Sequence, residues 1–329
     1  MFSAIYIEDE VKDSERVAGI LARFPDIPHI NCERYGEVFN RKRQSFRLQK
    51  QAPALILASK HGKAVLPAPA GYGFTESHSF YFSHMLNCLY DCRYCFLQGM
   101  YRSANYVLFV NYEDFASEIR SQAQQVDAEQ VFYSGYDCYS LAMDPVSEFC
   151  AFILPLFDGL QNATLELRTK STQVRALLDY SPIKNCVIAM SFTAHDAASR
   201  WEHRTPSIAK RLEALLKLQQ AGWNIALRFE PIIMEQGVEE AYQQLFAEIF
   251  SVLDADQLHS VSTGLFRMPS GYYRNITKQF PDEPLFALPT NSVDGVISLR
   301  NANEAERLGA VEKSLFNYVD SQRYYRCAD

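Results

Sequence analysis

The stretch Ser83-His-Met-Leu-Asn-Cys-Leu-Tyr-Asp-Cys-Arg-Tyr-Cys-Phe-Leu-Gln98 carries three closely spaced cysteines, Cys88, Cys92 and Cys95. Thiolates in such a run are typical ligands of iron–sulfur clusters. A cubane cluster has four irons, and in ordinary electron carriers a separate cysteine binds each of them. The three cysteines therefore predict a [4Fe–4S] cluster with one iron left open for a small molecule.

A structural zinc site is the main alternative interpretation of these cysteines. Tetrahedral structural zinc takes four Cys or His ligands, usually in paired spacings. The nearest candidates for a fourth ligand, His84 and Cys138, do not form such a pair. A disulfide framework suits small secreted chains better than a chain with eight cysteines in 329 residues. The spacing favours the cluster over both alternatives.

Composition limits the compartment and the partners. The N-terminus lacks a charged segment followed by a long apolar one, and no run approaches the about 18–20 apolar residues of a membrane span. We therefore expect a soluble protein of the reducing cytoplasm with no membrane partner. The net charge of −7 argues against nucleic-acid binding over the whole surface, because such affinity is built from Lys and Arg.

The order of apolar segments predicts the fold class. From the cysteine stretch to about residue 280, segments rich in β-branched and aromatic residues alternate with helical patterns such as residues 207–221, as in βαβ units. Six strands are expected, at residues 78–82, 130–134, 164–168, 186–192, 224–230 and 258–264. The prediction is an α/β protein with a partial (β/α)6 barrel over residues 77–280.

Extensions are expected on both sides of this barrel. Residues 1–76 form an N-terminal α/β extension, with strands at 3–7 and 55–59 and a helix at 11–24. Residues 281–329 form a C-terminal strand–helix extension, with the strand at 294–300 and the helix at 302–319. Parallel barrels carry their reactive groups at the carboxyl ends of the strands, and the cysteine loop follows the first barrel strand.

With the cysteine loop and these elements in order, the chain resembles the spore photoproduct lyase family of radical SAM proteins nearly end to end. The cysteine loop has the C-x3-C-x2-C spacing of radical SAM enzymes, with an aromatic residue before the last cysteine. The other shared landmarks are individually weak and persuade by their order. All landmarks are Tyr94, Tyr6-Ile7-Glu8, Phe96-Leu97-Gln98, Val110-Asn111, Thr169-Lys170, Ser191, Thr205-Pro206-Ser207, Arg267, Arg274 and Lys278.

The resemblance implies a function. Such an enzyme binds S-adenosylmethionine at the open iron, takes an electron from reduced flavodoxin or ferredoxin, and cleaves the cofactor to methionine and a 5′-deoxyadenosyl radical. In the family, the radical starts repair of a methylene-bridged thymine dimer in DNA, a lyase reaction that breaks a carbon–carbon bond. Two alternatives stay open: a radical SAM enzyme for another nucleotide or a peptide, and a non-catalytic protein that binds a structural metal.

Five residues are candidates for contact with S-adenosylmethionine. Glycine at the end of the second strand permits a close approach of the backbone to a ligand. The resemblance selects Lys170 over Arg168 as the partner of the cofactor carboxylate, and Ser191 is a candidate for the ribose or the carboxylate. Solvated or structural roles are the alternative for these side chains. The full set is Tyr94, Ser134, Gly135, Lys170 and Ser191.

One departure from the family concerns the return of a hydrogen atom to the product. The lyases use a cysteine just after the second strand for this step. Aligned on Leu141 to Asp144, this chain has Tyr136 at that position and Cys138 two residues further on. Tyr136 and Cys138 are therefore candidate catalytic residues, and Cys327 near the C-terminus is a weaker candidate thiol. For Cys138 the alternative is a small buried residue, as free cysteines usually are.

Two basic groups are candidates for DNA phosphate contacts, which position a strand without reading its sequence. The densest basic run spans residues 41–50 and includes Phe46 as a potential stacking group. The second group lies near the far end of the barrel, in a region that the lyase family uses for DNA. Ordinary exposed helix faces are the alternative. The candidates are Arg41, Lys42, Arg43, Arg267, Arg274 and Lys278.

Overall fold

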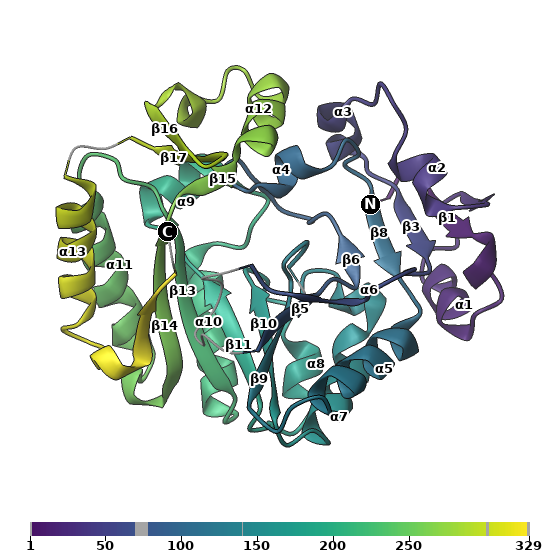
Figure 1. Ribbon diagram of the computed structural model, residues 1–329, viewed down its shortest axis with the longest axis horizontal. Coiled ribbons are helices and arrows are strands. Elements are labelled where there is room, and N and C mark those ends of the chain that lie inside the picture. The colour runs from purple at the N-terminus through teal and green to yellow at the C-terminus, as the bar shows by residue number, and fades with distance from the viewer. Residues whose placement is uncertain (1, 70–77, 140, 301–302, 328–329) are drawn as a thin grey trace.

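The computed structural model describes residues 2–69, 78–139, 141–300 and 303–327, and its largest sheet is a curved half-barrel (Figure 1). Its strands pair in the order β18-β14-β13-β11-β10-β9-β5-β4, all parallel except the β4–β5 pair. They are β4 (Val65–Pro67), β5 (Ser79–Phe82), β9 (Gln130–Ser134), β10 (Ala163–Thr169), β11 (Cys186–Ser191), β13 (Asn224–Ile232), β14 (Leu258–Leu265) and β18 (Tyr324–Arg326).

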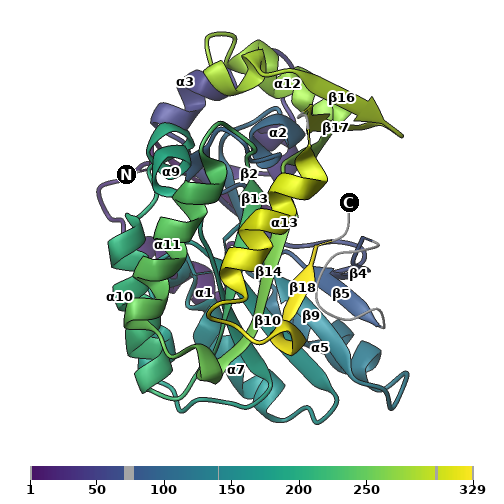
Figure 2. The ribbon, with the colours of Figure 1, turned by 90° about the vertical axis from the view of Figure 1, so that its left-hand side faces the viewer.

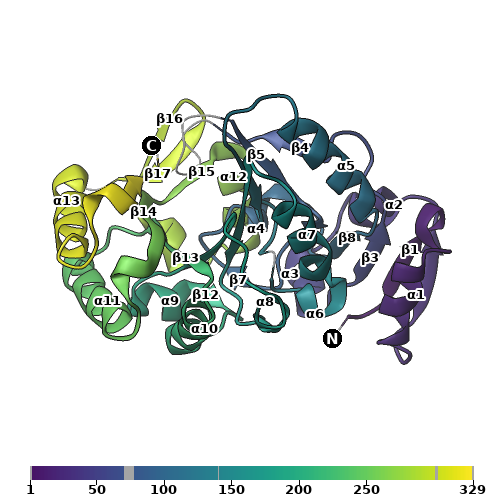
Figure 3. The same ribbon diagram turned by 90° about the horizontal axis from the view of Figure 1, so that it is seen from below.

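The six predicted barrel strands are confirmed as β5, β9, β10, β11, β13 and β14, which neighbour one another in chain order. Parallel neighbours need crossover connections, and helices in these connections lie along the outer side of the sheet (Figure 3). The main outer helices are α5 (Tyr112–Ala123), α7 (Phe149–Asp158), α8 (Arg175–Leu178), α10 (Ile208–Gln220) and α11 (Val238–Val252). The partial barrel is therefore confirmed.

Helix α10 illustrates how the sequence produces these layers. Ser207 caps its start, because the hydroxyl accepts a hydrogen bond from the Lys210 amide at 3.4 Å. Leu212 and Leu215 recur at helical spacing and are buried against the sheet. The strand beneath, β11, is buried along its whole length, as expected for a parallel sheet whose inner face also lines the barrel.

A second sheet of five strands lies beside the barrel (Figure 1). It pairs in the order β2 (His29–Cys32), β1 (Ile5–Glu8), β3 (Leu55–Ala58), β8 (Tyr106–Phe109) and β6 (Met85–Leu86). Strands β6 and β8 come from the range predicted for the barrel and flank the cysteine loop. They attach that loop directly to the N-terminal sheet. The predicted boundary at residues 76 and 77 lies outside the described residues.

The helices around this second sheet are short. Residues Asp9–Val11 form a 3-10 turn, so the helix predicted at 11–24 begins only at Glu15. In the basic run at residues 41–50, the first five residues lie in a turn and the segment before α3 (Phe46–Gln51), and the other five lie on α3. The helices of this region are α1 (Glu15–Ala22), α2 (Tyr35–Phe39), α3, α4 (Leu97–Met100) and α6 (Asp144–Ser147).

The C-terminal extension covers one edge of the barrel (Figure 2). Helix α13 (Glu304–Leu315) packs on α11, where Arg307 pairs with Glu239 at 2.6 Å. The helix was predicted at 302–319, and Ala302 lies outside the described residues. Strand β18 then pairs with β14 at the sheet edge. Ahead of α13 lie α12 (Ser270–Gln279) and a sheet of β15 (Arg267–Pro269), β17 (Val296–Leu299) and β16 (Thr290–Val293). None of the described helices has the length and apolar character that a bilayer crossing requires.

Candidate active site

The three cysteines lie in a loop that is fixed on both sides. Cys92 belongs to the two-residue strand β7 (Asp91–Cys92), which pairs antiparallel with β12 (Glu202–His203) after helix α9 (His195–Trp201). The Arg93 amide donates to the Trp201 carbonyl at 2.8 Å. The Cys95 amide donates to the Cys92 carbonyl at 3.1 Å as the chain turns into α4. The loop therefore has a defined backbone path from strand to helix.

The donor set fits an iron–sulfur cluster. Cys88 and Cys92 are buried, Cys95 is partly exposed, and no disulfide joins them. Burial raises the pKa of the Cys95 thiol to about 11 and also raises that of Cys88, so these thiols are protonated until a metal displaces the protons. The Tyr90 amide points at Cys88 Sγ, 3.4 Å away. Such N–H contacts to sulfur stabilise thiolate ligands and tune a cluster.

The described residues contain no group of three or more His, Cys, Asp or Glu side chains arranged around a single metal ion. A cubane cluster makes a different demand, because each thiolate binds its own iron and the sulfurs need not converge on one point. The geometry of the cysteine loop is therefore compatible with a cluster.

Two buried lysines bring positive charge to the cysteines. Lys50 Nζ donates to the Cys88 carbonyl at 2.6 Å, although Lys50 stands in the run predicted to meet phosphates. Lys170, which is fully buried, also lowers the pKa of Cys88 against the larger opposing effect of burial. Positive charge near the thiols favours the thiolate form that metal binding requires.

Lys170 belongs to a buried cluster that the sequence did not indicate. Its ammonium donates to the Tyr139 hydroxyl at 3.1 Å and lies 3.5 Å from Glu202 Oε1. Tyr94 and Arg211 also bond Glu202. Burial would raise the pKa of Glu202, but Lys170 and Arg211 lower it to about 2, so the carboxylate is charged. Lys170 thus lies beside the predicted aromatic residue Tyr94, as expected for one site.

The remaining candidates for the cofactor lie at one edge of the sheet. Ser134 ends β9, Lys170 follows β10 and Ser191 ends β11, and the parallel register puts these ends side by side. Gly135 has a φ of 105°, a conformation that residues with a Cβ rarely adopt. The Ser191 carbonyl accepts a bond from Arg211 Nη1 at 3.0 Å. Their contact with a cofactor stays a prediction.

The two candidate hydrogen donors lie in different environments. The Tyr136 ring is 4.6 Å from the Tyr81 ring and 5.5 Å from the Phe96 ring, which in turn is 6.3 Å from Tyr272. These four side chains are partly exposed, and we call them the aromatic cluster. Cys138 is instead buried in the apolar core of the N-terminal sheet. Tyr136 therefore lies among partly exposed rings, one of which, Phe96, directly follows Cys95. Cys138 is buried near Cys88, since burial and then Cys88 raise the pKa of its thiol.

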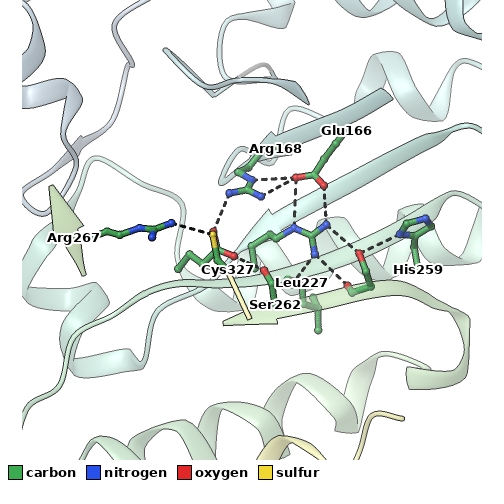
Figure 4. Close-up of polar contacts among 10 residues, drawn as sticks. Glu166, Arg168, Leu227, His259, Ser262, Arg267 and Cys327 are labelled. Carbon is green, nitrogen blue, oxygen red and sulfur yellow. Dashed lines mark hydrogen bonds and ion pairs between the residues drawn. The ribbon is translucent and has the colours of Figure 1, made fainter. Parts of the chain in front are cut away.

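A network of charged groups fills the barrel interior (Figure 4). Glu166 pairs with Arg228 at 2.7 Å and with Arg168 at 3.0 Å, and Arg168 also pairs with Glu230 at 3.0 Å. These partners engage Arg168, which agrees with the choice of Lys170 for the cofactor. At the edge of the network, Arg267 donates to Cys327 Sγ at 3.6 Å.

The predicted phosphate contacts fall in three places: the turn before α3, helix α12 and strand β15. Arg41, Lys42 and Arg43 are exposed in the turn before α3, with Arg41 Nε bonded to the Glu37 carbonyl at 2.8 Å. Arg274 and Lys278 are exposed on α12, and Arg267 is exposed on β15. Lys50 is the exception, since it is buried and turned toward the cysteine loop.

With the geometry established, comparison with known proteins decides the family. The family model described as "Spore photoproduct lyase" matches residues 77–285 of the chain. The chain belongs to the spore photoproduct lyase family. The resemblance read from the cysteine loop and its ordered landmarks is thereby confirmed.

Curated members of the spore photoproduct lyase family match part of the chain. The spore photoproduct lyase of Bacillus subtilis (strain 168) is 26% identical over 203 residues, and that of Geobacillus sp. (strain Y412MC61) is 25% identical over 206 residues. Each match covers 60% of this chain and 59% of the relative.

Solved structures of the family share the fold over the whole chain. A spore photoproduct lyase with serine in place of one cysteine superposes with a TM-score of 0.83 at 17% identity, covering 100% of this chain and 98% of that one. A spore photoproduct lyase complexed with dinucleoside spore photoproduct gives a TM-score of 0.82 at 16% identity with the same coverage. These matches confirm the fold.

Proposed function

We propose that this chain is a radical SAM lyase that repairs a thymine photoproduct in DNA. The observation that carries the proposal is the fixed loop of Cys88, Cys92 and Cys95, which lies beside buried Lys170 at the carboxyl ends of the barrel strands. Such strand ends are where parallel barrels hold their reactive groups. Family membership supports the same activity.

The chain's residues divide the binding of the cofactors among them. Cys88, Cys92 and Cys95 would hold a [4Fe–4S] cluster, and Tyr94, Ser134, Gly135, Lys170 and Ser191 would hold S-adenosylmethionine. When bound and reduced, this pair supplies a 5′-deoxyadenosyl radical for hydrogen abstraction. The protein's part is to orient the reactants and to exclude water. Lys170 suits the cofactor carboxylate because its charge is fixed in a buried position.

The aromatic cluster supports a nucleobase substrate. Tyr81, Phe96, Tyr136 and Tyr272 are partly exposed, and Phe96 directly follows Cys95. Aromatic rings of this kind stack on extruded or single-stranded bases. Solved relatives include one with bound AdoMet and dinucleoside spore photoproduct. A thymine dinucleotide is therefore the substrate class that we propose.

The surroundings of Tyr136 support it, over Cys138, as the group that returns a hydrogen atom to the product. Burial raises the pKa of Tyr136 to about 12, so the phenol keeps its proton at neutral pH. Cys138 lies near Cys88 but is buried in the core of the N-terminal sheet, outside the partly exposed aromatic cluster.

Reduced flavodoxin or ferredoxin is the proposed electron donor. The oxygen-sensitive cluster suits the reducing cytoplasm, where such carriers and DNA are both present. Exposed Arg267, Arg274 and Lys278, together with Arg41, Lys42 and Arg43, are the proposed contacts to DNA phosphates.

The test is a repair assay with a synthetic dinucleoside spore photoproduct. Anaerobically reconstituted protein is incubated with S-adenosylmethionine and dithionite, and release of thymidine units is measured by chromatography. We expect release with wild type and none with Cys92→Ala. Formation of 5′-deoxyadenosine without release would instead indicate a radical SAM enzyme for another nucleotide or a peptide.

A further inference from the structure

A small basic pocket lies on the outer side of the cysteine loop. Its volume is about 210 Å³, and it lies between helix α3, strand β7 and the residue that follows α12. The lining residues used in the argument are Arg47, Lys50, Asp91, Arg93, Arg204 and Phe280. None of these side chains belongs to the aromatic cluster or to the proposed S-adenosylmethionine contacts.

The pocket carries excess positive charge although the chain has a net charge of −7. Arg93 is neutralised by Asp91 at 2.6 Å and by Glu283 at 3.3 Å. Within the described residues, no ion pair joins a carboxylate to Arg47, Lys50 or Arg204. Three cations therefore lack a direct carboxylate partner in one small concave region, which attracts an anionic surface.

The pocket is connected directly to the cluster ligands. Lys50, which is only 4% exposed, donates to the Cys88 carbonyl at 2.6 Å. Arg204 Nη1 in turn donates to the Lys50 carbonyl at 2.7 Å. Asp91, another lining residue, precedes Cys92 in β7. A partner seated here would be separated from the cysteine thiols only by the loop itself.

We infer that this pocket is the docking site for an acidic one-electron carrier protein, such as a flavodoxin, whose surface carboxylates meet the exposed Arg47 and Arg204 over the buried charge of Lys50. The inference rests on the proposed function, since only a redox-active cluster needs a carrier. Electron transfer slows steeply with distance, so a carrier must approach the cluster closely. Charge complementarity also speeds the encounter of the two proteins.

The pocket suits a protein carboxylate better than a nucleic acid. Phe280 is 8% exposed and lies beneath two guanidinium groups, with Arg93 at 4.1 Å and Arg47 at 5.5 Å from its ring centroid. It is therefore covered and cannot stack on a base. The partly exposed rings that could stack on bases are in the aromatic cluster, outside this pocket.

The test measures association of oxidised flavodoxin with the reconstituted holoenzyme at low salt. The variant Arg47→Glu and the double variant Arg47→Glu/Arg204→Glu are compared with wild type. The matched control is Lys210→Glu/Lys313→Glu, which makes the same charge change at exposed positions on α10 and α13. We expect association of the double variant to be slower by on the order of tenfold, with a weaker salt dependence, while the control stays within about twofold.

Each outcome of this test has one reading. If the double variant is unstable, the single variant Arg47→Glu is used in its place. Its effect on the fold should be small, because the Arg47 guanidinium lies over the Phe280 ring and forms no ion pair among the described residues. If flavodoxin associates with that variant as fast as with wild type, the docking site is overturned. It is also overturned if the variant loses affinity for oligonucleotides alone. If wild type forms no 5′-deoxyadenosine even with dithionite, the proposed function fails; if it does, a negative docking result counts against the pocket alone.

Discussion

Near the cysteine loop, side chains of opposite charge are buried next to one another. Lys170 is fully buried between Glu202 and Tyr139, and Arg211 balances the same carboxylate from the other side. An unpaired buried charge would be costly, so these groups must be present together. The Lys170 ammonium is therefore held in place by Glu202 and Tyr139 without a ligand, and its proposed role is to bind a cofactor carboxylate.

Replacement of Lys170 tests this role. We expect Lys170→Met to weaken binding of S-adenosylmethionine by about tenfold or more, because a hydrogen bond to a charged group contributes about 1.5–3 kcal/mol. Equilibrium dialysis of the reconstituted protein with labelled S-adenosylmethionine measures the change. Lys184→Met is the control, since Lys184 is exposed and precedes β11, at the opposite end of that strand from Ser191. Equal affinities of wild type and Lys170→Met would assign Lys170 a structural role.

Tyr136→Phe separates hydrogen return from radical formation. The variant keeps the ring that packs on Tyr81 and Phe96 but removes the hydroxyl. We expect 5′-deoxyadenosine to form at a rate close to wild type while intact thymidine product falls and side products appear, as chromatography of the reaction mixture would show. Unchanged product in Tyr136→Phe, together with its loss in Cys138→Ser, would move the role to Cys138.

At the level of elements, strand β12 connects the cysteine loop to helix α10. Glu202 on β12 bonds Arg211 on α10 and faces Cys92 across the strand pair. Breaking a buried ion pair on one side typically costs about 3–5 kcal/mol. We expect Glu202→Gln to lower the free energy of unfolding by roughly this amount in urea titrations. Glu213→Gln, in an exposed pair with Lys217, should change it by no measurable amount; the reverse order would contradict the account.

The network across β10 and β13 predicts a pH dependence of stability. Burial alone would raise the pKa of Glu166, but Arg228 and Arg168 hold it at about 2, below the ordinary value of 4.5. A lowered pKa means that the charged carboxylate stabilises the fold fully above pH 4.5, and that this contribution disappears as the pH falls toward 2.

Comparison of wild type with Glu166→Gln measures that contribution. The difference in Tm between the two proteins should be largest near neutral pH and shrink as the pH falls from 4.5 toward 2, because in this range the unfolded chain binds a proton at Glu166 that the folded protein does not. A difference that stays constant over this range would show that the ion pairs of Glu166 do not stabilise the fold.

The local pattern of the sequence predicted some elements and missed others. The six barrel strands were predictable because each is a short apolar run between helical patterns, and the cysteines were predictable from their spacing. The pairing of β8 with β3 was not, since it joins segments about fifty residues apart by backbone bonds that leave no periodic signal. Glu202 and Arg211 were missed because their side chains meet each other, and Glu202 meets Lys170, only in the folded structure, and their spacing in the sequence gives no sign of it. Lys50 was misread because its burial depends on the approach of the cysteine loop.

For the whole molecule, the proposed binding of DNA depends on local basic surfaces, because the chain has a net charge of −7. Arg274 and Lys278 are exposed on α12. We expect Arg274→Ala/Lys278→Ala to weaken oligonucleotide binding to a similar degree for all sequences and to lower the salt slope of log affinity by about two, as for two lost phosphate contacts. Fluorescence anisotropy over a salt series measures both. Sequence-dependent loss, or an unchanged slope, would show that these residues do not contact phosphates.

The central claim is that the cysteine loop supports reductive cleavage of S-adenosylmethionine. The most direct measurement is 5′-deoxyadenosine formed by anaerobically purified, iron- and sulfide-reconstituted protein with dithionite, beside Cys92→Ala treated in the same way. The account predicts 5′-deoxyadenosine from wild type and none from the variant, which should also bind less iron. Wild-type protein that binds zinc in place of iron, or that is loaded with cluster and forms no 5′-deoxyadenosine, would contradict it.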